Sequence, residues 1–266
     1  MIGPQRIICL TEETVETLYL LGAEERIVGV TGYAVRPARV RREKPRVGAF
    51  TSADVPKILA LEPDLVLTFS DLQADIAADL IRAGVAVHGF NQRDVAGIFE
   101  MIRTLGALVG HIAQANALIA ELESNVARVR ATAEGRIRPR VYFEEWDDPP
   151  IAGIAWVSEV IKIAGGVDVF ADRARAQGAK GRILDGRDVI AARPDLILAS
   201  WCGKKVRAEK IAARPGWDAI PAVAQGRIIE VKSPLVLAPG PAALSDGLAA
   251  IAAAIAETAN AMEPVA

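Results

Sequence analysis

An uninterrupted amphipathic segment, Ala113 to Ala133, constrains the fold of this chain more than any other stretch. Its apolar residues recur at helical spacing, and neither glycine nor proline interrupts them. A helix of this length extends about 30 Å, at about 1.5 Å per residue. The apolar stripe consists of Ala115, Ile119, Leu122, Val126 and Val129. The segment predicts one continuous helix that ties two parts of the chain together.

Two similar segments stand on either side of this helix. Residues 58–67 read ILALEPDLVL, and residues 189–198 read VIAARPDLIL. Their likeness predicts two similar lobes. The expected boundaries are an N-terminal lobe at 1–110, a linking helix at 111–135 and a C-terminal lobe at 136–266.

Apolar strand-like runs alternate with helical segments in both predicted lobes. The expected strands lie at 6–10, 27–30, 65–69, 85–87, 140–143, 167–170, 196–199 and 227–231. The basic segment 36–46 is expected to be a long loop. This alternation is typical of α/β lobes with central parallel sheets and right-handed crossovers. A ligand is expected to bind in a cleft between the lobes, where loops at the carboxyl ends of the strands meet.

The charge balance argues against several classes of protein. The chain of 266 residues has a formal net charge of -2 and a pI near 5.9, so it lacks the cationic field that nucleic-acid binding needs. Charged residues interrupt every apolar run before the roughly 18 residues that cross a bilayer, so no membrane span is expected. Met1 to Arg6 shows no export signal, which predicts a cytoplasmic protein; a trimmed leader would instead indicate the periplasm.

Cysteine and histidine are too rare for a metal centre built from several of them. Cys9 and Cys202 are expected to be buried free thiols. His88 and His111 are the two histidines, which excludes a site made of several imidazoles. His88, at a strand end, is either a structural residue or a ligand to a metal-centred cofactor, and His111 is expected at a helix end.

Polar and aromatic residues gather at the predicted strand ends. Aromatic residues make up only 5% of the chain, so their concentration there favours a cleft that stacks on a ligand, although each could merely fill a loop edge. Backbone groups together with Lys232, Ser233 or Glu145 are expected to orient the ligand by hydrogen bonds. The candidate ligand-binding residues are Thr11, Glu12, Tyr33, Phe50, Ser70, Asp71, Glu145, Trp146, Asp148, Trp201, Lys232 and Ser233.

No motif in the chain requires catalysis. The acidic residues at 144–148 are interpreted as a solvated loop, with an acid pair or a hard-cation site as alternatives. The basic loop Gly178 to Arg182 could hold an anion, but it lacks a phosphate-binding glycine pattern. We therefore expect no catalytic residue and no metal site. The alternative from another class is an enzyme that uses the acidic loop or Cys202 on a bound cofactor.

In the order and spacing of its short motifs, the chain resembles the solute-binding proteins of ABC importers for cobalamin, haem and ferric siderophores. The resemblance covers nearly the whole chain, and its motifs are RIICL at 6–10, EPDLV at 62–66, RPGW at 214–217 and PGP at 239–241. It implies two α/β lobes joined by one rigid helix, and a protein that binds a small molecule without transforming it.

Within this family, the cobalamin-binding branch is the most similar. Tyr33 and Phe50 fall where that branch places aromatic residues against the corrin, although Phe50 replaces the usual tryptophan. Asp148-Pro149-Pro150 resembles an Asn-Pro-Pro turn at the second-lobe site, and Trp201 is similarly placed after a strand. The resemblance implies cobalamin or a related corrinoid as the ligand, another tetrapyrrole such as haem or a ferric siderophore as alternatives, and no cofactor of the protein's own.

The resemblance also implies an ABC permease as partner, but two residues depart from it. Importer-linked members carry a docking glutamate on the outer edge of each lobe, and Pro56 and Arg187 stand at those positions here. Asp54 and Asp188 are close neighbours that could substitute. Together with the missing export signal, this departure suggests a second interpretation, a cytoplasmic relative that keeps the ligand cleft without the importer.

Overall fold

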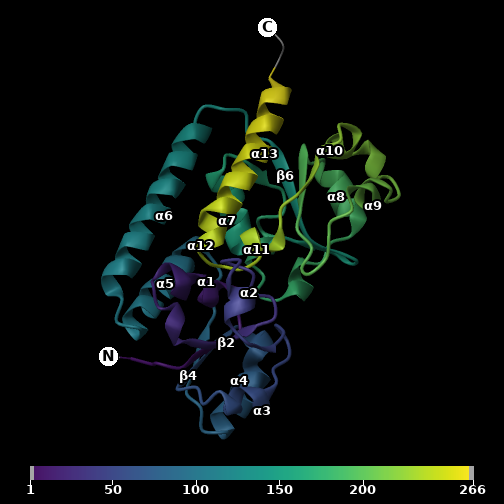
Figure 1. Cartoon of the computed structure of the whole chain (residues 1–266). Coiled ribbons are helices and arrows are strands. Elements are labelled where there is room, and N and C mark those ends of the chain that lie inside the picture. The colour runs from purple at the N-terminus through teal and green to yellow at the C-terminus, as the bar shows by residue number, and fades with distance from the viewer. Residues whose placement is uncertain (1–2, 264–266) are drawn as a thin grey trace. The chain divides into compact units, whose positions relative to one another are not determined.

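The computed structural model describes residues 3–263, and the chain divides into two compact units (Figure 1). Unit 1 comprises Met1–Gln92 and Ala96–Leu122, and unit 2 comprises Arg93–Val95 and Glu123–Ala266. The boundary falls inside helix α6 (Ile112–Ala133), which the sequence predicts almost to the residue. Four of its five stripe residues are buried, and Val126 is half-buried. The predicted α/β class, with parallel sheets in two units linked by a long helix, is confirmed.

Unit 1 contains a parallel sheet of five strands in the order β3-β2-β1-β4-β5. The strands are β1 (Ile7–Cys9), β2 (Ile27–Thr31), β3 (Arg46–Gly48), β4 (Leu65–Phe69) and β5 (Val87–Phe90). Four helices and two short 3-10 turns connect them: α1 (Glu12–Leu20), η1 (Glu24–Arg26), α2 (Val40–Glu43), α3 (Val55–Ala60), η2 (Asp71–Gln73) and α4 (Ala74–Arg82). Helix α5 (Val95–Leu108) follows β5 and leads to α6. Every residue of β4 is buried, as its continuous apolar run predicts for a parallel strand.

Two details of unit 1 differ from the sequence prediction. The segment 36–46 is not one loop, because it contains α2 and the first residue of β3. Strand β5 begins at Val87 rather than Val85. The Val85 amide instead donates to the Leu80 carbonyl (3.0 Å) in the turn that ends α4, so pairing with β4 starts two residues later.

Unit 2 contains strands in the order β10-β9-β6-β7, with β8 also paired to β6. The strands are β6 (Arg140–Asp147), β7 (Pro150–Ala152), β8 (Val167–Asp168), β9 (Leu196–Ala199) and β10 (Ile228–Glu230). The helical elements are α7 (Ala155–Ile163), η3 (Arg173–Arg175), η4 (Ala179–Arg182), α8 (Gly186–Ala192), α9 (Ala208–Ala212), η5 (Trp217–Ala219), α10 (Pro221–Ala224), α11 (Ser233–Val236), α12 (Pro241–Leu244) and α13 (Asp246–Met262).

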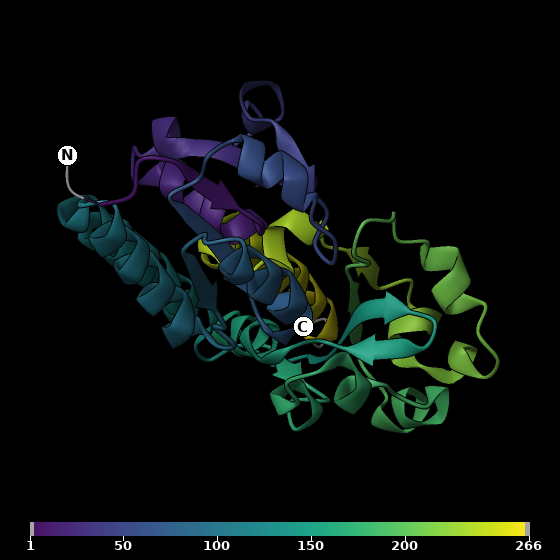
Figure 2. The same ribbon diagram turned by 90° about the horizontal axis from the view of Figure 1, so that it is seen from below.

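One pair of strands in unit 2 is antiparallel, which the sequence analysis missed. Strand β6 continues beyond the predicted end at Phe143 and pairs with β7 as a hairpin, visible as adjacent teal arrows in Figure 2. The acidic residues Glu144 to Asp147 therefore lie in a strand. The interpretation of 144–148 as a solvated loop is wrong, because only Asp148 of these residues is exposed.

The internal repeat extends to matching side-chain contacts in the two units. In unit 1, the Asp64 carboxylate accepts from the Arg6 amide (2.9 Å), and the Arg6 guanidinium donates to carbonyl oxygens after α3. In unit 2, Asp195 accepts from the Arg140 amide (2.8 Å), and Arg140 donates to the last carbonyl of α8 (2.8 Å). Each arginine thus links the start of one strand, β1 or β6, to the turn that precedes the neighbouring strand, β4 or β9.

The same turn holds a left-handed residue in both units, and we expect glycine to stabilise it. Glu62 has φ 45° and Arg193 has φ 44°, a conformation in which a side chain costs about 1 kcal/mol. Glu62→Gly and Arg193→Gly should therefore each raise the free energy of unfolding by up to about 1 kcal/mol, measured by urea unfolding. Ala192→Gly, in right-handed α8, is the matched control and should lower it by about 0.5–1 kcal/mol. Destabilisation by both turn variants would contradict the argument.

One segment, Pro241–Met262, is long and apolar enough to cross a membrane by length and composition, although none was expected. Of its most apolar window, 56% is buried inside the protein. The buried residues of α13 recur at helical spacing from Gly247 to Ala259, and α13 packs against α7 within unit 2 (Figure 1). This burial is typical of a core helix in a globular unit.

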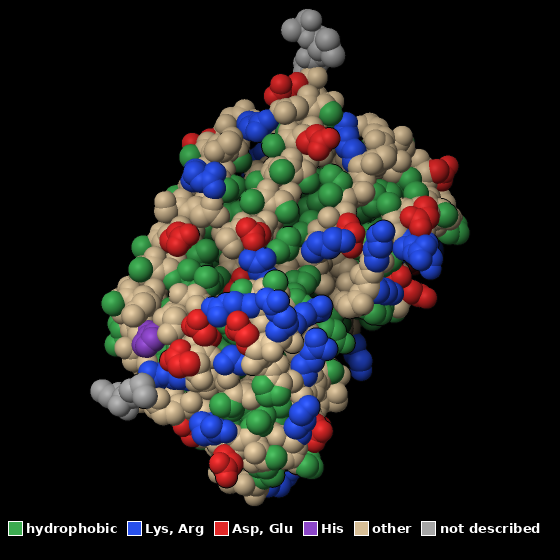
Figure 3. Space-filling view, in the orientation of Figure 1, with side chains coloured by type: hydrophobic (Ala, Val, Ile, Leu, Met, Phe, Trp, Pro, Cys, Tyr) green, Lys and Arg blue, Asp and Glu red, His purple; other side chains and the backbone are tan. Residues whose placement is uncertain are grey.

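Charged side chains of both signs are interspersed on the face shown in Figure 3. Within unit 1, Arg36 pairs with Glu16 (2.7 Å), and Arg39 pairs with Glu24 (2.8 Å) and Glu43 (3.3 Å). Part of the positive charge of the segment 36–46 is therefore neutralised inside the unit.

Candidate functional site

The unit 1 candidates lie at one edge of its parallel sheet, because each follows the carboxyl end of a strand. Glu12 and Thr11 follow β1, Tyr33 follows β2, and Phe50 follows β3; Ser70 and Asp71 follow β4. We call these six residues the unit 1 edge. Tyr33 is 42% exposed and Phe50 is half-buried, so both residues are partly open to solvent, whereas Thr11 is buried.

Gln73, which the sequence analysis missed, holds three of these loops together. Its side-chain amide donates to the carbonyl oxygens of Leu10 (3.1 Å) and Phe50 (2.7 Å), and its Oε1 accepts from the Phe69 amide (2.9 Å). The residue is 1% exposed. Gln73 therefore fixes the Phe50 loop against the ends of β1 and β4. Only its position soon after a buried strand could have indicated this role.

Two glutamates at the start of α1 have strongly raised pKa values. Burial, together with the nearby charges of Glu13 and Glu16, raises the pKa of Glu12 to about 8. Burial also raises the pKa of Glu13 to about 7, although a hydrogen bond from Thr11 acts in the opposite direction. Near neutral pH, Glu12 is therefore mostly a neutral carboxylic acid and can donate a hydrogen bond from the unit 1 edge.

In unit 2, several candidates surround a hollow of about 320 Å³ at the carboxyl ends of β9 and β10. We call it the lysine pocket. Its lining contains Trp201, Gly203, Lys204, Lys205, Glu230, Val231, Lys232, Ser233 and Pro234. Trp146 adjoins this set, because the Lys204 ammonium lies 3.9 Å from the centre of its ring and 5.2 Å from that of Trp201. The predicted residues Trp201, Lys232 and Ser233 thus lie together.

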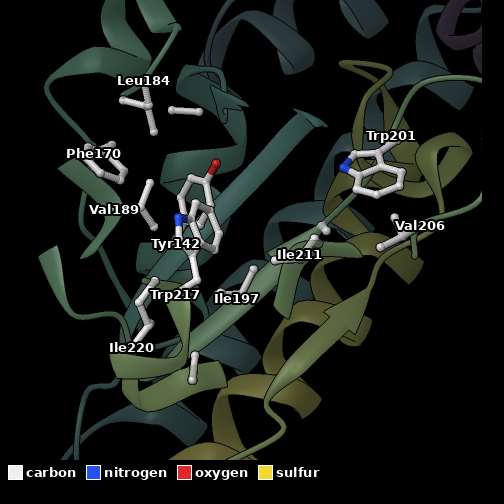
Figure 4. Close-up of a cluster of buried hydrophobic side chains, with 13 residues drawn as sticks. Tyr142, Phe170, Leu184, Val189, Ile197, Trp201, Val206, Ile211, Trp217 and Ile220 are labelled. Carbon is white, nitrogen blue, oxygen red and sulfur yellow. The ribbon is translucent and has the colours of Figure 1, made fainter. Parts of the chain in front are cut away.

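The expectation that Trp201 offers an open stacking face is wrong. Its side chain is 3% exposed and packs beside Val206 and Ile211 in the unit 2 core (Figure 4). Its indole nitrogen donates to Glu144 Oε1 (3.1 Å). Trp201 supports the pocket from the core side, because a buried carboxylate fixes its ring.

Glu144 is the centre of a buried polar network that the sequence analysis did not foresee. It is fully buried, and its carboxylate accepts from Arg214 through both guanidinium NH groups, from Trp201, and from the Tyr142 hydroxyl (3.0 Å). Arg214 also donates to the Asp147 carbonyl (3.0 Å) and lies 4.5 Å from the Trp217 ring centre. Burial raises the pKa of Glu144 despite Arg214. This network joins β6, the loop after β9 and the loop after α9.

Glu145 is also committed within the protein, which corrects its proposed role as a ligand contact. Both of its carboxylate oxygens accept from Arg182 (2.6 and 3.0 Å), whose side chain is buried. The pair attaches η4 to the β6–β7 hairpin. Neither Glu144 nor Glu145 is therefore part of a free acid pair or an open cation site.

Near the hairpin turn, Trp146 donates from its indole nitrogen to the Asp148 carbonyl (3.0 Å), and Lys204 pairs with Asp147. Partial burial opposes ionisation of Asp147, but Lys204 outweighs it and lowers the pKa of that carboxyl. The Asp148 side chain is exposed. The turn thus presents the Trp146 ring and the Asp148 carboxylate.

The two cysteines differ in burial. Cys9 is buried as expected, and burial raises the pKa of its thiol to about 12. Cys202 is exposed, so the expectation of a buried thiol is wrong for it, because the strand ends three residues earlier at Ala199. Within residues 3–263, no group of three His, Cys, Asp or Glu side chains is arranged to hold a metal ion.

Neither histidine lies on a loop of these edges. His88 lies within β5, where its ring meets Phe90 edge-on at 4.4 Å and burial lowers its pKa. His111 lies in the turn before α6, as expected for a helix-end residue, and its Nδ1 is 2.7 Å from the Leu21 carbonyl oxygen.

Acidic residues lie close to Pro56 and Arg187, the two positions where the resemblance implies docking glutamates. Pro56 is exposed in α3, and the neighbouring Asp54 accepts from the Lys57 amide (3.0 Å) as the helix cap. Arg187 is exposed and pairs with Asp185 (2.7 Å), while Asp188 is exposed in the first turn of α8.

Sequence comparison places this geometry among known proteins. The pattern of the family described as "Periplasmic binding protein" matches residues 7–235. A Halobacterium salinarum protein named "Cobalamin-binding protein" is 28% identical over 173 residues, covering 64% of this chain and 47% of that protein. The match thus spans about half the length of that relative. A Bacillus subtilis protein named "Uncharacterized ABC transporter substrate-binding lipoprotein YvrC" is 26% identical over 248 residues, covering 90% of this chain and 76% of that protein.

Solved structures share the fold over nearly the whole chain. The periplasmic heme-binding protein RhuT from Roseiflexus sp. RS-1 is 25% identical with a TM-score of 0.84, covering 97% of this chain and 100% of that one. The periplasmic vitamin B12 binding protein BtuF of Vibrio cholerae is 20% identical with a TM-score of 0.78, covering 97% and 99%. The shared fold therefore spans proteins with different ligands.

Proposed function

Because this chain belongs to the periplasmic binding protein family, we propose that it binds cobalamin or a related corrinoid and releases it unchanged. Named members of the family are binding proteins. The observation that carries the proposal is the unit 1 edge, where the partly exposed aromatic residues Tyr33 and Phe50 lie at the same sheet edge as polar residues. Such a mixture of aromatic faces and few polar groups is typical of small-molecule sites.

The preference for a corrinoid over haem rests on the relatives. Haem iron in proteins is held by histidine, cysteine, methionine or tyrosine. Neither histidine of this chain lies on the edge loops, but Tyr33 does, so haem stays the alternative ligand. Cobalamin carries its own axial base, so it needs only stacking and hydrogen bonds. The Halobacterium relative named for cobalamin supports the same ligand.

We assign two kinds of contact to the candidate residues. Tyr33, Phe50 and Trp146 supply flat apolar faces for the macrocycle. Neutral Glu12 donates a hydrogen bond, and the other polar contacts come from Ser70, Asp71, Asp148, Lys232 and Ser233. Thr11 and Trp201, both buried, support these residues from behind.

An ABC importer is the proposed partner, and the Bacillus relative named as a transporter lipoprotein supports it. Arg187 presents a positive charge where a basic permease surface needs a negative one, so docking is proposed to depend on Asp54 and Asp188. An importer component acts outside the cytoplasmic membrane, whereas a relative without an importer suits the cytoplasm. Fractionation of the source cells distinguishes the two.

Titration with four ligands tests the proposal. Cyanocobalamin, aquocobalamin, haemin and a ferric hydroxamate siderophore are added to the protein, and binding is followed by calorimetry and by quenching of tryptophan fluorescence. Saturable binding of the cobalamins at micromolar or lower concentration is expected. Tighter binding of haemin or the siderophore would replace the corrinoid by that ligand. Chemical conversion of bound cobalamin would instead favour the enzyme alternative.

Phe50→Ala is expected to weaken cobalamin binding about tenfold, because it removes an aromatic contact worth about 1–1.5 kcal/mol. The fold should persist, since Phe50 is only half-buried. Calorimetric titration measures the change. Ile81→Ala is the control, because Ile81 is 60% exposed on α4, outside the edge. Equal affinity of the wild type and Phe50→Ala would remove Phe50 from the site.

A further inference from the structure

The lysine pocket carries more positive than negative charge. Its lining includes three lysines, Lys204, Lys205 and Lys232, and one acidic residue, Glu230. The exposed lysines follow the ends of β9 and β10, at the same edge as Trp146. A concave surface with this imbalance attracts an anion.

Two of these three lysines form ion pairs with carboxylates of the protein, and within residues 3–263 the third does not. Lys232 pairs with Glu230 (2.7 Å), and Lys204 pairs with Asp147 while it lies over the Trp146 ring. Lys205 forms no ion pair in the described part of the chain. The Lys205 charge nevertheless acts on Glu230. Partial burial opposes ionisation of the Glu230 carboxyl, but Lys232 and, more weakly, Lys205 lower its pKa. The pocket therefore has one unmatched positive charge.

The rest of the lining suits a small anionic group on a larger ligand. Pro234 contributes apolar surface, with the buried Trp201 and Val231 behind it, and the Ser233 hydroxyl can donate a hydrogen bond. Gly203, with φ 73°, turns the chain at the rim without a side chain. At about 320 Å³, the pocket lies at the lower limit of sites that hold a whole ligand, so it fits a substituent.

Resting on the proposed function, we propose that the lysine pocket binds the phosphodiester of the corrinoid's nucleotide loop, with Lys205 as the main charge partner. The phosphodiester carries one negative charge, which matches the one unpaired ammonium group. Lysine binds such oxygens as a point charge with three donors and needs no fixed geometry. The site would thus select base-bearing corrinoids over those that lack the nucleotide.

A thermodynamic cycle tests this selection with two corrinoids. Cyanocobalamin contains the phosphodiester, and dicyanocobinamide lacks it together with the nucleotide. Both are titrated calorimetrically into the wild type, Lys205→Met and Lys205→Arg at low and high salt. Lys180→Met, at an exposed position of η4 outside the pocket, is the matched control. Haemin is titrated as well, because its carboxylates are another source of negative charge.

Lys205→Met is expected to weaken cyanocobalamin binding about fivefold at low salt and less at high salt, while dicyanocobinamide binding changes less than twofold. Lys205→Arg, which keeps the charge, should restore most of the affinity. An equal loss for both corrinoids, or no loss for either, overturns this inference and leaves the proposed function in place. A loss confined to haemin also overturns it. Failure of the wild type to bind either corrinoid overturns the proposed function and, with it, this assignment.

Discussion

Replacing Glu144 by alanine is expected to lower the free energy of unfolding by about 3–5 kcal/mol, because it leaves the Arg214 guanidinium half-buried without its carboxylate. The same change removes the acceptor of the Tyr142 hydroxyl and of the Trp201 indole nitrogen. Urea unfolding followed by tryptophan fluorescence measures the loss, since all four tryptophans belong to unit 2.

Two further variants separate the network from a general effect of losing a carboxylate. Glu209→Ala removes an exposed partner of Arg207 at 3.7 Å, and a change below about 1 kcal/mol is expected. The double variant Glu144→Leu with Arg214→Met should recover part of the loss, because it no longer leaves a charge unpaired. A cost for Glu144→Ala as small as that of Glu209→Ala would show that the network adds little to stability.

Unit 1 is expected to lose stability as the pH rises from about 5 to 8, because the buried Glu13 and the half-buried Glu12 must release protons. The folded protein holds the Glu13 proton up to about pH 7, whereas the ordinary pKa of this group is 4.5. Between these values, the folded state binds more protons than the unfolded state, so the free energy of unfolding falls with rising pH. The loss from Glu13 is about 3 kcal/mol, at about 1.4 kcal/mol per pH unit. Glu12 adds a loss of the same sign through about pH 8.

Glu13→Gln should flatten this pH dependence, since an amide keeps an acceptor for the Thr11 hydroxyl but carries no proton to release. Urea unfolding at pH 5.5, 7.0 and 8.5, followed by circular dichroism, measures the slope. As the pH rises, the free energy of unfolding of the variant is expected to increase relative to that of the wild type. Glu121→Gln, at an exposed position of α6, is the matched control and should follow the wild type. Parallel curves for Glu13→Gln and the wild type would show that Glu13 titrates normally.

The candidate binding loops could be predicted from sequence only in part. The loops at the strand ends were found because parallel strands end at one edge, and this needs only the order of strands and helices. The direction of each side chain needs the packed structure. The sequence places Trp201 and Glu145 near this edge correctly. In the structure, however, the Trp201 side chain points into the core toward Glu144, and the Glu145 side chain pairs with Arg182. The ligand roles of Tyr33 and Phe50 stay predictions.

By itself, the sequence determined the elements whose signal is local. Helix α6, the buried strand β4 and the similarity of the segments 58–67 and 189–198 follow from periodicity, from uninterrupted apolar runs and from a motif that occurs twice. The tertiary structure alone decided the partners of buried polar groups. Glu144 meets Arg214 across 70 residues, and Gln73 reaches back 63 residues to Leu10. A buried charge or amide needs a partner wherever the fold supplies one, and sequence spacing does not say where that is.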